Sequence, residues 1–331
     1  MYMKIKRLPV AVSRLQAIMV AAVFCLALSN ASTVAQDTVR VGVGVDPSFT
    51  SWWVAADKGF FAKRNLKVEI TQFSGGPDLA DATMAGEQDF GSSGTATWMP
   101  RFVRSDSLRI LCTMATSPNN FKMAALTSIT SLSDLKRKRV GTVSGSSTDY
   151  LWALVVKKLE IPESGLDVVG VTPPELVPAL VRGDVQAFFS WEPWPTKAVE
   201  IGGKDMVHIL ASSGDVGYFQ SFVVVGNKNF LQAKPDVTAR VLAALRDATH
   251  YLNNERADAI KIAATRNKMT PEMAEYIVGL YTFKVDLAES MVAGARTEEA
   301  WMRGKERLRG SPIDWNVVVD RSYFDRAMAM N

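Results

Sequence analysis

Histidine and cysteine are scarce in this chain of 331 residues, which contains two of each. His208 lies in the strand-like segment MVHILA and His250 lies in a helical segment, and neither has a partner at the spacing of a metal site. Both are therefore expected to be structural or surface residues. The chain also lacks the phosphate-binding pattern G-x-x-x-x-G-K-S/T, which argues against nucleotide hydrolysis. We predict no metal, no cofactor and no enzymatic activity.

Long apolar runs are also missing, apart from one near the N-terminus. A basic head that includes Lys4, Lys6 and Arg7 precedes a run about one export-signal core long, which is too short to span a bilayer comfortably. Small residues at Thr33 and Ala35 suit a cleavage site. Residues 1–35 are thus predicted to be a signal peptide, the alternative being an uncleaved membrane anchor.

Removal of this segment changes what composition implies. It takes away four of the 38 basic residues and none of the 34 acidic ones, so the mature chain carries no net charge. The basic character of the precursor therefore belongs to its export signal and predicts no nucleic-acid partner. Only Cys112 remains after cleavage, which leaves it no internal disulfide partner, and its strand-like setting favours a small buried apolar residue.

Strand and helix patterns alternate from Thr38 onward, which is typical of an α/β fold with parallel sheets flanked by helices. The order repeats once. Residues 39–42 resemble 138–141, and the helical segment 77–87 resembles 174–184, each with proline in the first turn and a stop at Gly86 or Gly183. We predict two similarly built lobes, each with a largely parallel sheet.

Ligands of such sheets bind beyond the carboxyl ends of the strands. Five loops then become candidates for a shared site, namely 46–53, 74–78, 91–98, 144–150 and 190–194.

Two of these loops combine glycine with hydroxyl side chains at a helix start. Gly145 permits a tight turn before Ser146, Ser147 and Thr148, any of which can cap the next helix. The segment DFGSSGTATW has the same combination of glycine and hydroxyl residues, and Pro100 places the start of its helix near Thr97. Free N–H groups and hydroxyls at helix starts favour an anion, although these residues can also serve only as caps.

Aromatic side chains gather in the same loops. Five of the eight tryptophans lie there, and these rings would form an apolar wall. Glu192 stands among them and could pair with an amine or with nearby backbone. The five loops contain no lysine or arginine. A bare inorganic ion such as nitrate would need a basic side chain, so an organic sulfonate or carboxylate fits better.

The chain resembles a known family, the periplasmic binding proteins of nitrate, sulfonate and taurine ABC importers. The residues that carry the resemblance are 52–94, 131–155, 173–194 and 312–329. It implies a two-lobed type II periplasmic-binding-protein fold with a two-strand hinge near Phe121 and Tyr218. The first lobe would comprise residues 36–126 and 218–331, and the second lobe residues 127–217.

The resemblance also implies a function. The exported protein would be a monomer in the periplasm that captures a small organic anion between its lobes and delivers it to an ABC permease. Two alternatives are an enzyme of the related thiamin-pyrimidine synthase type and an extracytoplasmic sensory module. The predicted ligand-binding residues are Ser48, Trp52, Trp53, Gly75, Gly76, Ser92, Ser93, Gly94, Thr95, Ser146, Ser147, Thr148, Trp191, Glu192, Trp194 and Tyr218.

Overall fold

The computed structural model describes residues 35–159, 165 and 167–330. The expected export signal falls outside these ranges except for its last residue, and the chain from Asp37 onward forms one unit. In the described ranges, no helix combines the length and the apolar character needed to cross a membrane.

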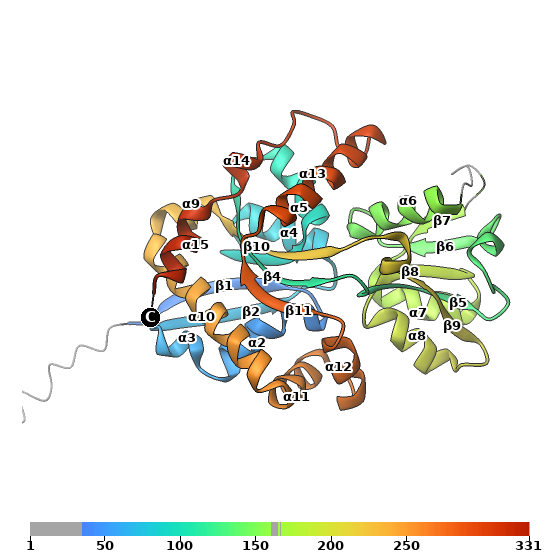
Figure 1. The fold of residues 1–331 in the computed structure, drawn as a ribbon, viewed down its shortest axis with the longest axis horizontal. Helices are drawn as coiled ribbons and strands as arrows, with labels where there is room; N and C mark the ends of the chain where they lie inside the picture. The colour runs from blue at the N-terminus through green and yellow to red at the C-terminus, as the bar shows by residue number, and fades with distance from the viewer. Residues whose placement is uncertain (1–34, 160–164, 166, 331) are drawn as a thin grey trace, which may run out of the picture. The chain divides into compact units, whose positions relative to one another are not determined.

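The first of two sheets has six strands in the order β11-β4-β10-β3-β1-β2 (Figure 1). Strands β2 and β3 each pair in parallel with β1. Strand β10 pairs antiparallel with both β3 and β4, and β11 pairs antiparallel with β4. The strands are β1 (Asp37–Val43), β2 (Leu66–Gln72), β3 (Phe90–Gly94), β4 (Leu108–Ser117), β10 (Gln220–Asn227) and β11 (Thr282–Asp286).

The second sheet has five strands in the order β7-β6-β8-β5-β9. Here β7, β6 and β8 run parallel, and β5 pairs antiparallel with both β8 and β9. The strands are β5 (Phe121–Leu126), β6 (Arg139–Thr142), β7 (Asp167–Gly170), β8 (Ala187–Trp191) and β9 (Val207–Ser212).

Both sheets follow one plan, as the sequence repeat predicts. In each, the first strand of the set lies between the second and the third, and a strand from elsewhere in the chain, β10 or β5, separates the third from the fourth. The expectation of largely parallel sheets therefore holds only for the first three strands of each. Both sheets are mixed because the strand that follows each crossing, β10 in the first sheet and β5 in the second, runs antiparallel to its neighbours, and β11 adds another antiparallel pair to the first sheet.

Helices flank both sheets. Around the first sheet they are α2 (Thr50–Asp57), α3 (Phe60–Lys63), α4 (Gly76–Ala85), α5 (Thr95–Arg104), α9 (Lys228–Ala233), α10 (Pro235–Asn254), α11 (Arg256–Asn267), α12 (Pro271–Val278), α13 (Glu289–Gly304), α14 (Trp315–Val318) and α15 (Arg321–Met328). Around the second they are α6 (Ser147–Leu159), α7 (Pro173–Arg182) and α8 (Trp194–Gly202). Short 3₁₀ turns are η1 (Pro47–Phe49), η2 (Leu132–Leu135) and η4 (Ser213–Val216).

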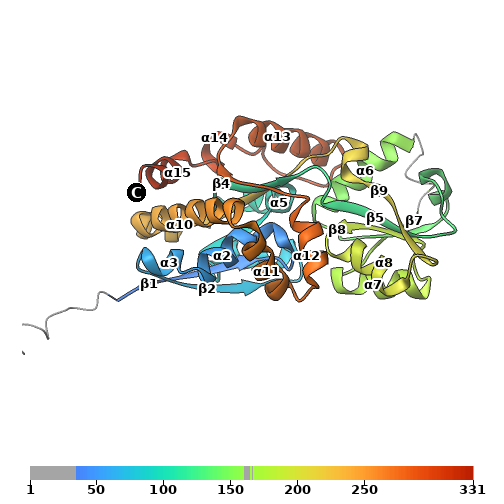
Figure 2. The same cartoon turned by 60° about the horizontal axis from the view of Figure 1, so that its bottom comes forward.

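Each sheet buries a core on both faces, because successive strand residues point to opposite sides. Along β10, Phe222 and Val224 pack on the side of α2 and α10, while Val223 and Val225 pack on the side of α4, α5 and α13. In the second sheet Phe189 faces α6 and Phe188 faces α7 and α8. Figure 2 shows these helices on opposite sides of their sheets.

Local details confirm several sequence predictions and revise two. Helices α4 and α7 begin with proline in the first turn and end at Gly86 and Gly183 in the left-handed conformation. Residues 51–64 have the sequence pattern of one continuous helix, but Gly59 breaks this segment into α2 and α3. Helix α5 begins at Thr95 rather than near Thr97, and it accepts Pro100 in its interior at the loss of one backbone hydrogen bond.

The chain crosses between the sheets twice, between Ser117 and Phe121 and between Ser212 and Gln220. The lobe boundaries given above at 126/127 and 217/218 stay a prediction. Cys112 is fully buried in β4, which agrees with its interpretation as a small apolar residue.

Candidate functional site

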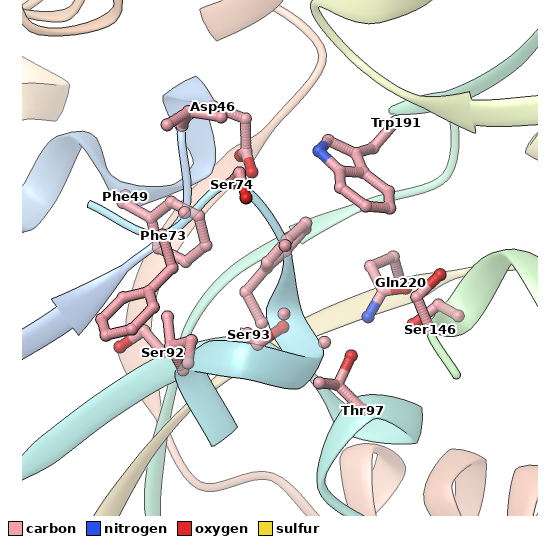
Figure 3. A pocket seen from close by; sticks show the side chains of 18 of the residues that line it. Asp46, Phe49, Phe73, Ser74, Ser92, Ser93, Thr97, Ser146, Trp191 and Gln220 are labelled. Carbon is pink, nitrogen blue, oxygen red and sulfur yellow. The ribbon is translucent and has the colours of Figure 1, made fainter. Parts of the chain in front are cut away.

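A pocket lies where the carboxyl ends of parallel strands from both sheets meet. Its empty volume is about 480 Å³, its open mouth included. All five loops chosen from the sequence contribute to its wall, together with residues of β5 and β10 (Figure 3). The pocket therefore joins segments from both halves of the sequence repeat.

Three helices begin at this wall. The residue before each helix lines the pocket, namely Gly75 for α4, Gly94 for α5 and Ser146 for α6, and so do the first residues of α4 and α6, Gly76 and Ser147. Neither Gly75 nor Gly94 can cap its helix with a side chain, so first-turn N–H groups stay available there. We call Gly75, Gly76, Ser93, Gly94, Ser146 and Ser147 the helix-start cluster.

Two glycines let these helix starts approach each other. A Cβ atom added to Gly76 would lie 2.8 Å from the Ser93 hydroxyl oxygen. A Cβ atom on Gly94 would lie 2.3 Å from Gln220 Nε2 and 2.9 Å from Ser147 Oγ. Any side chain at either position would push neighbouring polar groups apart, so the cluster depends on both glycines.

The α6 start is held by its own hydroxyls. Gly145 has a φ of 75°, as expected for the tight turn. The Ser146 hydroxyl accepts the Thr148 N–H at 3.2 Å and donates to the Val143 carbonyl at 2.7 Å. Thr148 is fully buried, and its hydroxyl accepts the Val143 N–H at 3.1 Å. Thr148 thus fixes the turn, while Ser146 and Ser147 remain at the pocket wall.

The rest of the wall is largely apolar. Figure 3 shows Phe49 and Phe73 on one side of the pocket and the half-buried Trp191 across from them. Phe121 packs edge-on against Trp191, with 6.3 Å between ring centroids, and so supports that ring. These rings suit an organic group.

Asp46 is the ionisable residue of the wall. Asp46 is 95% buried, and one of its carboxylate oxygens, Oδ1, accepts both the N–H and the hydroxyl of Ser48. Burial raises the pKa of Asp46 to about 7, against the opposing effect of the Ser48 hydrogen bonds. Among the residues that the structure describes, no lysine, arginine or histidine lines this pocket.

Of the sixteen residues predicted to bind ligand, eight line the pocket. They are Gly75, Gly76, Ser92, Ser93, Gly94, Ser146, Ser147 and Trp191. The other eight pack behind or beside it and are Ser48, Trp52, Trp53, Thr95, Thr148, Glu192, Trp194 and Tyr218.

The three predicted tryptophans that do not line the pocket contact other groups. Trp52 is fully buried in the first core and donates from Nε1 to the Ser92 hydroxyl at 2.9 Å. It therefore orients a pocket hydroxyl without reaching the pocket. Trp53 packs beneath the Arg266 guanidinium, 5.1 Å from its ring centroid, and Trp194 lies similarly under Lys197.

Glu192 is already engaged by protein groups. Its carboxylate pairs with Lys122 Nζ at 2.6 Å and accepts the hydroxyl and the N–H of Thr196. Both Lys122 and Glu192 are buried. The Glu192 carboxylate therefore stabilises the segment that leads into α8.

Thr95 and Tyr218 meet at a second buried acid. The carboxylate of Glu298 in α13 accepts the Thr95 hydroxyl at 2.5 Å and lies 2.7 Å from the Tyr218 hydroxyl. Burial raises the pKa of Glu298 to about 7. Tyr218 also lies 2.7 Å from Gln220 Oε1 and has one proton to donate, so a protonated Glu298 satisfies the network best.

Sequence reasoning did not select several pocket residues. Phe73, Thr97, Gln220 and Phe222 come from strand ends and from the first turn of a helix, where only the fold shows which way a side chain points. Asp46 stands first in one of the five predicted loops, and its position three residues after the end of β1 was a usable signal.

The arrangement can hold an anionic group by hydrogen bonds alone. First-turn N–H groups and helix dipoles attract negative charge, and the hydroxyls of Ser93 and Ser147 add donors. Aromatic rings then accommodate an apolar part of the same molecule.

The comparisons with known proteins agree with this fold. The chain is similar to a solved structure, the alkanesulfonate-binding protein SsuA from Xanthomonas axonopodis pv. citri bound to MOPS. The TM-score is 0.77 at 19% identity, over 88% of this chain and 100% of that one. The two structures thus share the two-lobed periplasmic-binding-protein fold.

Curated relatives lie at similar distances in sequence. A putative aliphatic sulfonates-binding protein of Bacillus subtilis is 22% identical over 94% of this chain and 96% of its own length. The taurine-binding periplasmic protein of Escherichia coli is 24% identical over 60% of this chain and 62% of its own length. A family model described as NMT1/THI5 like matches residues 46–259, and the chain belongs to this family.

Proposed function

We propose that this protein is the solute-binding component of an ABC importer. It captures a small organic anion between its two lobes and delivers it to a membrane permease. The anion is a sulfonate, a taurine-like compound or a carboxylate. The protein acts in the periplasm as a monomer after residues 1–35 are removed, and it catalyses no reaction.

One observation carries this proposal. Three helix starts from both sheets line one pocket, and within the described residues that pocket has no basic side chain. Such a site stabilises an anion through N–H groups, dipoles and hydroxyls. The aromatic wall favours a ligand with an organic part over a bare inorganic ion. The names of the similar proteins support the same ligand class.

A thermal-shift screen of the chain from residue 36 tests the proposal. The panel contains alkanesulfonates, taurine, aromatic carboxylates and nitrate. At least one organic anion should raise the melting temperature in a concentration-dependent manner, since a ligand at 100 times its Kd adds about 2.7 kcal/mol. Nitrate should give a smaller shift. A melting temperature unmoved by every organic anion would refute the assignment.

A further inference from the structure

The pocket that faces a proposed anion also contains an unpaired acid. Asp46 is the ionisable residue among the described lining, and its other oxygen, Oδ2, accepts no hydrogen bond from the described residues. No basic group of the described chain lies within ion-pair distance of it. This differs from Glu192, whose carboxylate is neutralised by Lys122.

Asp46 and the helix-start cluster occupy different parts of the wall. In Figure 3, Asp46 lies on the side of the pocket between Phe49 and Trp191, and Thr97 and Ser146 lie on a second side away from it. Gly76 and Gly94 belong with that second side, because Cβ atoms on them would touch Thr97 and Ser147 respectively. The pocket therefore has an end that attracts negative charge and an end that attracts positive charge.

Aromatic rings border the acidic end. A Cβ atom on Gly44 would lie 2.7 Å from the Phe49 ring and 3.3 Å from Asp46 Oδ2, so the ring and the carboxylate flank the same point. The Trp191 indole nitrogen is turned toward Asp46 in Figure 3. A cation bound beside this carboxylate gains ion pairing and a charge-assisted hydrogen bond.

An anion alone is a poor match for this pocket, because the ionised carboxylate would repel it. A ligand with a cationic nitrogen turns that repulsion into attraction. We propose that the pocket selects a zwitterion, with its anionic head at the helix-start cluster and a protonated or alkylated nitrogen at Asp46. This inference rests on the proposed function, and it assigns Asp46 as the residue that binds the cationic nitrogen of the ligand.

The groups that face Asp46 support the assignment. Ser48 occupies only Oδ1, and the buried Tyr281 lies near enough for the charge of Asp46 to raise the pKa of its hydroxyl, although burial is the larger cause. Neither neighbour supplies positive charge, so a cation at this end must come from the ligand.

Calorimetry with matched ligand pairs tests the inference. Each pair replaces an ammonium group by a methyl group of similar size: taurine and 1-propanesulfonate, homotaurine and 1-butanesulfonate, and 4-(aminomethyl)benzenesulfonate and 4-ethylbenzenesulfonate. We expect the intact protein to bind the amine at least tenfold more tightly in one or more pairs. Equal affinity in all pairs, or preference for the methyl partner, would overturn the inference.

The variant Asp46→Asn assigns the preference to this residue. Asparagine keeps the oxygen that accepts the Ser48 hydrogen bonds, so the loop should fold unchanged. The amine partner should lose at least tenfold in affinity while the methyl partner is unchanged or bound more tightly. Glu298→Gln is the matched control, since it removes a buried carboxyl that does not line the pocket, and it should keep the preference.

The outcomes separate the two proposals. If the methyl partners bind and Asp46→Asn leaves the amine preference unchanged, the organic-anion function stands and the role of Asp46 is wrong. If no member of any pair binds either protein and no carboxylate of the thermal-shift panel binds, the proposed function fails with it. If only Asp46→Asn binds sulfonates, and binds both partners equally, Asp46 repels ligands and the inference is overturned.

Discussion

At the scale of single residues, Ser93 and Ser147 are the side-chain donors of the helix-start cluster that come from different sheets. Each can give an anionic head one charge-assisted hydrogen bond, worth about 1.5–3 kcal/mol. The double variant Ser93→Ala with Ser147→Ala should weaken ligand binding more than tenfold in calorimetry. Its unfolding midpoint should stay near that of the parent, because neither hydroxyl caps its helix. Unchanged affinity would assign both loops to structure alone.

Buried carboxyls predict an unusual pH dependence of stability. The pKa of Glu298 is about 7 in the folded chain and ordinary in the unfolded chain, so folding favours the protonated form. The stability contributed by this group is complete below pH 4 and is lost as pH rises toward 7. In urea unfolding at pH 5, 6 and 7, Glu298→Gln should flatten this decline by up to about 1.4 kcal/mol per pH unit.

The control for this experiment is Glu289→Gln, an exposed carboxyl at the start of the same helix. It should leave the pH slope as in the parent. Asp37 and Asp81, whose pKa values are lowered by hydrogen bonds with arginines, are ionised by pH 5 and so do not affect this window. Equal slopes in the parent and in Glu298→Gln would show that Glu298 is ionised in the folded chain.

Sequence reasoning at this scale worked where a local rule exists. Helix-cap chemistry identified Ser146 and Ser147, and turn chemistry identified Gly145. It could not place Trp52, because nearly every residue of α2 is buried and such a helix has no polar face to orient it. It also passed over Asp46, since an aspartate before proline is an ordinary turn residue until the fold turns its carboxylate into a pocket.

At the scale of elements, the close approach of α5, α6 and β10 is the decisive feature. Gly94→Ala would place a methyl group within 2.3 Å of Gln220 Nε2. We expect ligand affinity to fall at least tenfold and the free energy of unfolding to fall by about 1–3 kcal/mol. Calorimetry and urea unfolding measure the two effects.

Gly294→Ala is the matched control for this substitution. Gly294 lies in α13 with nothing within 4 Å of an added Cβ atom, so alanine should leave affinity unchanged and raise stability by up to about 1 kcal/mol. If Gly94→Ala behaved like Gly294→Ala, the helix starts would not need their close contact.

The order of strands and helices along the chain was more predictable than the pairing of strands within the sheets. Hydrophobic alternation located the strands, and the repeat predicted that both halves share a plan. Neither pattern could predict that β10 lies beside β3 in the first sheet and that β5 lies beside β8 in the second. Those pairings join segments far apart in sequence, so no local pattern records them.

At the scale of the whole molecule, a ligand bound by residues from both sheets should favour closure around it. Small-angle scattering should show a smaller radius of gyration in the presence of saturating ligand. The Ser93→Ala, Ser147→Ala variant at the same ligand concentration should show little change. An unchanged radius in the parent at full saturation would exclude closure as part of capture.

The claim beneath all of these expectations is that helix-start N–H groups hold the anionic head of the ligand. Backbone amide NMR of the deuterated, ¹⁵N-labelled chain tests it directly. On saturation with a bound sulfonate, the amide protons of Gly76, Thr95 and Ser147 should move downfield more than those elsewhere in α4, α5 and α6. Shifts that spare all three helix starts, in a complex shown by calorimetry to form, would contradict the account.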